Sequence, residues 1–180
     1  VCTLSPALPM AKFQRETLGI TEAVQYNSNL VYNNMVLGAR AALADGVPVG
    51  MGTDTGCPYT THYNMWRELH YFQKEVGVTP EFALYTATLN NARILGLGDV
   101  TGSVEVGKCA DLFLIDSRRL ELVGSCFDAK SVLGTVGVRG AVDYTVVHGR
   151  VTVREGHLAT VDEGRVAEAA NAKCKAYLEM

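Results

Sequence analysis

Asp54 is the acidic residue of this sequence that is best placed to do chemistry. It follows residues 47–52, a short apolar run with glycines in which apolar and polar positions do not alternate. Such a run is typical of a strand buried on both faces, and β/α folds carry their sites at the carboxyl ends of such strands. A buried carboxylate is costly unless it is paired, hydrogen-bonded or bound to a cation. Spacing alone leaves an alternative open, in which Asp54 only caps the turn by accepting from the amides of Thr55 and Gly56.

The histidines are the next candidates, and there are four of them: His62, His70, His148 and His157. His62 lies in the loop after Asp54, so it could line the same site. We expect His70 to pack on a helix and the other two to occupy turns. None of the four forms H-x-H, H-E-x-x-H or a Cys/His zinc spacing. The residues by themselves therefore predict no complete metal site.

The cysteines predict free thiols and not a disulfide framework. There are five, Cys2, Cys57, Cys109, Cys126 and Cys174, and none are spaced as C-x-x-C. A short secreted chain held by disulfides would favour an even number. A reducing, cytoplasmic compartment is therefore expected. Cys57 follows a turn and could react, although no base lies near it in the sequence.

Composition limits the class of protein further. The 180 residues include 48% hydrophobic residues and carry a formal net charge of -3. That is enough apolar surface for a folded core, which excludes disorder as the main state. No run approaches the roughly 18 apolar residues that a membrane span needs. The mild acidity argues against nucleic-acid binding, which calls for a clustered basic surface.

The elements that must position Asp54 are predicted from apolar periodicity and from stop signals. Four helices are expected, over about 29–44, 64–76, 79–90 and 91–97. Gly46 and Gly77 are natural helix stops, and Thr79-Pro80 is a strong helix start. Together with strand-like residues 1–5 and 47–52, the order β-α-β-α predicts parallel β/α units.

The chain changes character at Gly98, after which glycines separate short β-rich runs. The runs are 111–115, 132–138, 142–147 and 151–153. Residues 147–151, Val-His-Gly-Arg-Val, are typical of a tight hairpin with glycine at the turn. Residues 163–178 follow an Ala-rich amphipathic pattern that predicts a C-terminal helix.

Four passages resemble the amidohydrolase superfamily of metal-dependent hydrolases, in the family's order and spacing. They are 43–54 (LADGVPVGMGTD), 79–97 (TPEFALYTATLNNARILGL), 102–112 (GSVEVGKCADL) and 146–151 (VVHGRV). The last passage has His148 where the family's hairpin usually carries Asn before Gly. Thr61-His62-Tyr63-Asn64 with Glu68-Leu69 is similar to the imidazolonepropionase-like and Xaa-Pro dipeptidase branch.

The resemblance implies an α/β fold that is the C-terminal portion of a TIM-like (β/α)8 barrel. Strands 7 and 8 and their helices would lie in residues 1–98, with Val1-Cys2-Thr3-Leu4 as strand seven. Residues 99–161 would form part of a small β-sandwich domain, and 162–180 a C-terminal helix. A complete barrel takes about 250 residues, and the family's H-x-H, its Lys or Glu and its further single histidines are absent from this sequence. We therefore expect a C-terminal fragment that is inactive alone.

The chemistry that the resemblance implies is hydrolysis of a C–N bond in an amide, cyclic amide or amidine by a metal-activated water. Asp54 matches the family's acid at the end of strand eight, which binds the metal and takes a proton from the water. Zinc is the expected metal, as one ion or two, with the other ligands outside this chain. His62 would help to bind a small-molecule substrate. The expected partner is the N-terminal remainder of the parent protein, with a homo-oligomer as a further option, and neither nucleic acid nor membrane.

Two alternatives belong to other classes of function. One is a non-catalytic scaffold, or an oligomerisation or binding module, derived from the same fold, whose unpaired strand edges would need cover. The other is an unrelated α/β binding domain, which requires the four matching passages to be coincidence. An H-x-H and further strand-end histidines upstream in the parent gene would favour the hydrolase.

Overall fold

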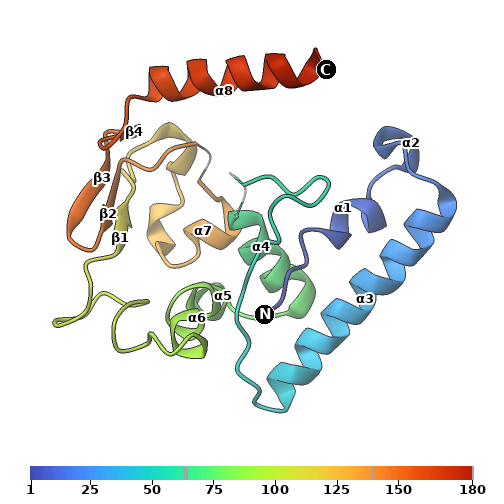
Figure 1. Ribbon diagram of the computed structural model, residues 1–180. Coiled ribbons are helices and arrows are strands. Elements are labelled where there is room, and N and C mark those ends of the chain that lie inside the picture. The colour runs from blue at the N-terminus through green and yellow to red at the C-terminus, as the bar shows by residue number, and fades with distance from the viewer. Residues whose placement is uncertain (63–64, 139, 180) are drawn as a thin grey trace. The chain divides into compact units, whose positions relative to one another are not determined.

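The computed structural model describes residues 1–62, 65–138 and 140–179 of the chain (Figure 1). The chain divides into two compact units. The first comprises Val1–Ser103 and Ser117–Arg139, and the second comprises Val104–Asp116 and Gly140–Met180. The first unit is mainly helical, and the second contains a four-stranded antiparallel sheet and a long helix. The α/β class predicted from the sequence is therefore confirmed.

The first unit is built from helices of very different length. They are α1 (Ala7–Lys12), α2 (Arg15–Leu18), α3 (Glu22–Ala44), α4 (Trp66–Tyr71), α5 (Pro80–Ala87), α6 (Leu89–Ile94) and α7 (Val132–Thr135). A π-helical turn, Phe72–Val76, continues α4, and 3-10 turns cover Leu120–Leu122 and Cys126–Asp128. No helix in the described part of the chain is both long enough and apolar enough to cross a membrane.

Helix α3 ends where the sequence predicts and begins earlier. Its last turn is followed by Gly46 at φ 69°, the left-handed stop that was expected. Its start is set by Thr21, whose side-chain oxygen accepts from the amide of Val24 at 3.3 Å. Residues 22–28 were missed because they are mostly polar, so they add no apolar periodicity to the first two turns.

The helices after Asp54 follow their predicted signals closely. Trp66 begins α4, and Asn64, the predicted start, lies outside the described residues. Gly77, at φ 91°, ends the π-helical turn as predicted. The side-chain oxygen of Thr79 accepts from the amide of Phe82 at 3.2 Å and caps α5, and Pro80 occupies its first position.

The two strand-like segments pair in parallel, as the β/α order predicts. Cys2 and Met51 form a parallel bridge. The amide of Cys2 donates to the carbonyl of Gly50 at 2.9 Å, and the amide of Gly52 donates to the carbonyl of Cys2 at 3.0 Å. The bridge is isolated, so the prediction of full strands over 1–5 and 47–52 is wrong for the described chain.

The ladder stops because its backbone groups have other partners. The amides of Leu4 and Ser5 donate to the carboxylate of Glu68. Pro48 has no amide hydrogen to donate. On the far side, the side chain of Asn91 accepts from the Met51 amide at 3.1 Å and donates to the Met51 carbonyl at 2.8 Å. An asparagine side chain thus takes the place that a neighbouring strand would occupy.

The core of the first unit joins these segments to helices α1, α3 and α4. Its large buried side chains are Leu4, Leu8, Tyr32, Val36, Val49, Met51, Leu69, Phe72 and Val76. The residues of α3 that face it recur at a helical spacing, namely Ser28, Tyr32, Val36 and Ala39. The segment that ends in Asp54 is therefore anchored in the core before it reaches the surface.

The predicted β-rich run over 132–138 is wrong, because Val132–Thr135 forms α7. The cause is close packing between glycines and the helix before Gly77. A Cβ atom on Gly134 would lie 1.6 Å from the side-chain nitrogen of Gln73, and one on Gly137 would lie 2.3 Å from the Trp66 ring. The glycines that suggested punctuation between strands are the residues that allow this approach.

The second unit contains a sheet in the order β1-β2-β3-β4, antiparallel throughout. Its strands are β1 (Leu112–Leu114), β2 (Tyr144–Val147), β3 (Arg150–Arg154) and β4 (His157–Leu158). His148 and Gly149, at φ 49° and 78°, form the predicted two-residue turn between β2 and β3. The hairpin and three of the four predicted β-rich runs are therefore confirmed.

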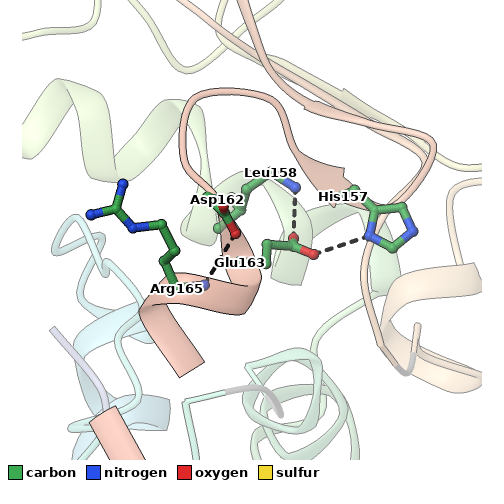
Figure 2. Close-up of polar contacts among 5 residues, drawn as sticks. All are labelled: His157, Leu158, Asp162, Glu163 and Arg165. Carbon is green, nitrogen blue, oxygen red and sulfur yellow. Dashed lines mark hydrogen bonds and ion pairs between the residues drawn. The ribbon is translucent and has the colours of Figure 1, made fainter. Parts of the chain in front are cut away.

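The C-terminal helix, α8, spans Glu163–Leu178 as predicted, and none of its described residues is buried. A cluster of polar contacts fixes its start (Figure 2). The carboxylate of Asp162 accepts from the amide of Arg165 at 3.1 Å. The carboxylate of Glu163 accepts from the amide of Leu158 at 2.7 Å and contacts His157 Nδ1 at 3.0 Å.

Residues 117–138 belong to a different unit from the one that the sequence predicts. The sequence places them with the small β domain, 99–161, whereas α7 packs on α4 and α5 in the first unit. Helix α8 belongs to the second unit together with the sheet. The division of the parent protein into 1–98, 99–161 and 162–180 stays a prediction.

Candidate functional site

Asp54 stands at the carboxyl end of the bridged segment in an unusual backbone conformation. Its φ is 51°, in the left-handed region that non-glycine residues seldom occupy, and its side chain is exposed. The Asp54 carbonyl accepts from the Cys57 amide at 3.3 Å and so closes the turn. The carboxylate accepts from the Cys57 thiol at 3.3 Å. The backbone, and not the carboxylate, therefore supplies the cap considered from the sequence.

The contact with Asp54 also changes the thiol of Cys57. A hydrogen bond to the carboxylate raises the pKa of this thiol above its ordinary value, with burial and the nearby negative charge acting in the same direction. A thiol with a raised pKa is a poor nucleophile at neutral pH. In this structure the thiol of Cys57 therefore serves as a hydrogen-bond partner of Asp54.

Asp54 opens onto a groove of about 470 Å³ in the first unit. The groove is lined by Thr3, Pro6, Ala7, Met10, Val24, Asn27, Ser28, Val31, Met35 and Asp54. Among these residues only Asp54 carries a charge. A single carboxylate at the rim of a mostly apolar groove fits the general form of a small-molecule site, in which few polar groups orient the ligand.

Consecutive asparagines hold the segment that leads to Asp54. Asn90 Nδ2 donates to the Val49 carbonyl at 2.8 Å, and Asn91 bonds both backbone groups of Met51. A Cβ atom on Gly50 would lie 2.2 Å from Asn91 Oδ1, so this approach requires glycine. This support was not predicted from the sequence, although two adjacent asparagines at the boundary of two predicted helices were a visible signal.

Glu68 is a second carboxylate, and its surroundings are the opposite of those of Asp54. It is 0% exposed and accepts from the Leu4 amide at 2.6 Å, the Ser5 amide at 2.8 Å and the Ser5 hydroxyl at 2.5 Å. Burial raises the pKa of Glu68, and these three hydrogen bonds partly oppose the rise. The signal for its burial was its spacing, since Glu68 lies four residues before Phe72 on the apolar stripe of the helix.

A smaller pocket of about 40 Å³ lies at the ends of the same two segments. It is lined by Ser5, Pro9, Phe13, Thr53, Tyr59, Thr60, Thr61, Arg67 and Tyr71. The hydroxyl of Thr60 is buried without a hydrogen-bond partner in the described part of the chain. The volume suits a few waters or one small polar group and not a whole substrate. No sequence pattern pointed to it, because its residues come from stretches that are far apart in the chain.

The predicted histidines do not line the groove that Asp54 lines. His62 is exposed in a turn, and it lines neither of these pockets. Its neighbours Tyr63 and Asn64, part of the branch motif, lie outside the described residues. His70 packs as expected, with Nδ1 3.1 Å from the Gly134 carbonyl. His157 is exposed in the short strand β4 and not in a turn.

The side chains that could bind a metal ion are those of His, Cys, Asp and Glu. Among the described residues, no three side chains of His, Cys, Asp or Glu come together closely enough to hold one. The exposed carboxylate of Asp54 can contribute one oxygen ligand at the end of its segment. The described part of this chain therefore offers a single ligand and not a complete site.

A parallel pairing of two segments with an acid at its carboxyl end is typical of a β/α hydrolase. Residues 4–152 match the model of the amidohydrolase family, so the chain belongs to that family. The superfamily predicted from the four sequence passages is confirmed.

Deaminases are among the curated relatives of this chain. The chain is 31% identical over 161 residues to a 5'-deoxyadenosine deaminase of Methanococcus maripaludis, covering 85% of this chain and 36% of the relative. It is 31% identical over 154 residues to a 5-methylthioadenosine/S-adenosylhomocysteine deaminase of Acetivibrio thermocellus, covering 77% and 35%. The chain thus spans about a third of the length of these curated relatives.

Solved structures agree with this assignment. A proposed prolidase of Bifidobacterium longum matches with a TM-score of 0.69 at 34% identity, covering 93% of this chain and 38% of that one. An adenosine deaminase of Xanthomonas campestris with bound zinc matches with a TM-score of 0.68 at 26% identity, covering 79% and 34%. The prolidase is in line with the Xaa-Pro dipeptidase part of the predicted branch. These relatives are hydrolases and deaminases that act on C–N bonds.

Proposed function

We propose that this chain is the C-terminal part of a metal-dependent hydrolase that acts on amide, cyclic amide or amidine bonds. Residues 1–4 and 47–54 would be the last two strands of its (β/α)8 barrel. The observation that carries the proposal is Asp54, an exposed carboxylate in left-handed backbone conformation at the end of a parallel-bridged segment. Strained residues that the surrounding structure holds in place often mark functional sites.

The role proposed for Asp54 follows from its position and its charge. A divalent metal, when bound, lowers the pKa of its water toward about 7. Asp54 would contribute one carboxylate oxygen as ligand and accept the water's proton on the other oxygen. Zinc is the proposed metal, as one ion or two, because it is bound in the Xanthomonas deaminase. The remaining ligands would come from the N-terminal part of the parent.

We assign the substrate to the groove beside Asp54, with His62 as a further substrate contact. The groove of about 470 Å³ is large enough for a small organic molecule, and its apolar lining would exclude water from the reacting bond. His62 does not line this groove, so it would contact only a part of the substrate that extends beyond the groove toward the loop after Asp54. The deaminase relatives support a small-molecule substrate with a C–N bond.

A scaffold without catalysis remains the second candidate, and the incomplete set of metal donors in the described chain favours it. Such a module would keep the fold and serve in binding or oligomer contacts. The two candidates differ in what Asp54 does. A hydrolase needs its carboxylate, whereas a scaffold needs only a residue that tolerates its backbone conformation.

The experiment is Asp54→Asn in the metal-loaded parent protein, assayed on a panel of amides, cyclic amides and aminopurines. Asparagine also tolerates a positive φ, so the turn should be kept. We expect kcat/KM to fall at least about 100-fold, because ligand and proton acceptor are lost together. Asp45→Asn, an exposed acid at the end of α3, is the matched control and should keep full activity. Full activity of Asp54→Asn would refute the assignment and leave the scaffold.

A further inference from the structure

We propose that Cys109 and His148 form a nucleophilic thiol–imidazole pair and that Cys109 is a site of covalent modification by small soft electrophiles. Both residues lie in the second unit, so the inference does not depend on the function proposed for Asp54. Cys109 Sγ lies 3.3 Å from Nδ1 of His148, across 39 positions of sequence. This distance is within hydrogen-bonding range for sulfur, so the imidazole can accept the thiol proton directly.

Hydrogen bonds from backbone amides tie the β2–β3 turn, which carries His148, to the segment that follows Cys109. The amide of His148 donates to Asp111 Oδ1 at 2.6 Å, and the amide of Gly149 donates to the Ala110 carbonyl at 3.2 Å. Both bonds join the β2–β3 turn to the two residues that follow Cys109. The turn is also tight, with His148 at φ 49°. The backbone of the turn is therefore held next to Cys109, within reach of its sulfur, and the Cys109 contact is made by the ring.

The pair is accessible, in contrast to two other thiols of the chain. Cys109 is half-buried, and His148 is exposed. Burial raises the pKa of Cys2, and the hydrogen bond to Asp54 raises the pKa of Cys57. Cys174 is exposed on α8, and within the described chain no imidazole bonds its thiol. Cys109 therefore combines access to reagents with a neighbouring base, which Cys174 lacks.

The reaction is a simple displacement. The sulfur of Cys109 attacks the electrophilic carbon of a reagent such as iodoacetamide, and an S–C bond forms as the C–I bond breaks. Iodide leaves with the bonding electron pair. The thiol proton passes to Nδ1 of His148, which requires the ring tautomer protonated at Nε2, and the resulting imidazolium returns it to water.

Neither Cys109 nor His148 is specified by the family's sequence pattern. His148 replaces the asparagine that usually precedes glycine in this hairpin, and Cys109 occupies the unspecified position of G-K-x-A-D. Asparagine at 148 would satisfy the positive φ equally well. The histidine is thus not needed for the turn, and its ring contacts the thiol of Cys109, which can gain reactivity from a base.

The test measures the alkylation rate of each cysteine in the 180-residue chain, by a brief iodoacetamide pulse and peptide mass spectrometry. We expect Cys109 to react about tenfold faster than Cys174, which serves as the internal exposed reference. His148→Asn should keep the turn and lower the rate at Cys109 to that of Cys174. His157→Asn, at an exposed histidine of β4, should change neither rate.

Two outcomes would overturn the pair. One is a rate at Cys109 equal to or below that of Cys174 in the unmodified chain, a comparison that needs no variant to fold. The other is an unchanged rate at Cys109 in a His148→Asn chain whose circular dichroism matches that of the starting chain. Loss of rate at Cys109 only, with Cys174 unaffected, supports the proposal.

Discussion

Two carboxylates of the first unit show how surroundings decide the role of a residue. Asp54 is exposed, and its one described side-chain contact is the Cys57 thiol. Glu68 is buried and already accepts from two amides and a hydroxyl, so its hydrogen-bonding capacity serves structure. The sequence predicted Asp54 as a site from its place after an apolar run. It could not separate structure from chemistry at Glu68, because the donors lie 63 and 64 positions away.

The structural role of Glu68 can be tested by removing its side chain. Glu68→Ala should lower the free energy of unfolding by about 3 kcal/mol, because the amides of Leu4 and Ser5 lose their carboxyl acceptor while they stay buried. Urea unfolding at pH 7 measures the change. Glu81→Ala, at an exposed position in the first turn of α5, is the control and should cost no more than about 1 kcal/mol. A loss at Glu68 as small as that of the control would mean that water or other groups satisfy the two amides.

Elements with local signals were predicted well, and elements that depend on distant contacts were not. Gly46, Gly77 and Thr79 act within one helical turn, so the end of α3 and the start of α5 could be located from the sequence. The fate of residues 132–138 depends on Gln73 and Trp66, far away in the chain, and a helix replaced the expected strand. The strand segments shortened for the same reason, since side chains of Asn91 and Glu68 took their backbone partners.

The start of α8 gives a pH-dependent prediction (Figure 2). The amide of Leu158, and then His157, lower the pKa of Glu163 in the folded chain. A carboxylate with a lowered folded pKa contributes stability above its unfolded pKa of about 4.3 and loses it as pH falls through the folded value. We therefore expect hydrogen-exchange protection of the Leu158 amide and the helicity of α8 to fall below about pH 4. Glu163→Ala, which removes the acceptor of the Leu158 amide, should lose most of that protection already at pH 7.

A matched control separates this contact from general effects of acid. Glu168→Ala removes an exposed carboxylate from the middle of the same helix and should leave protection of the Leu158 amide unchanged. Equal protection in Glu163→Ala and the unmodified chain at pH 7 would contradict the prediction. The asparagine variant of Asp162, whose side chain can still accept from the Arg165 amide, should also keep the helix start.

For the molecule as a whole, the sequence predicted the features that this chain shares with its family. The features that it could not predict depend on contacts with the remainder of the fold. The chain belongs to the amidohydrolase family, yet it spans about a third of the length of its curated relatives, 36% and 35%. Large apolar side chains of α3, such as Leu30 at 47% and Leu37 at 59%, are exposed. An apolar groove of about 280 Å³ also runs beside Cys2 and Met35. Exposed apolar surface of this kind is typical of a contact face.

The last prediction follows from that surface and from the proposed barrel. If residues 1–4 form the seventh strand, their free edge and the exposed face of α3 should pack against the N-terminal part of the parent. Mixing this chain with that part, expressed separately and supplied with zinc, should restore turnover that neither piece has alone. Asp54→Asn in this chain should abolish the recovery without preventing association. Leu30→Ser with Leu37→Ser on α3 should weaken association, whereas Val166→Ser on α8 should not. Turnover by the 180-residue chain alone would refute the expected inactivity, and association without any turnover would favour the scaffold over the hydrolase.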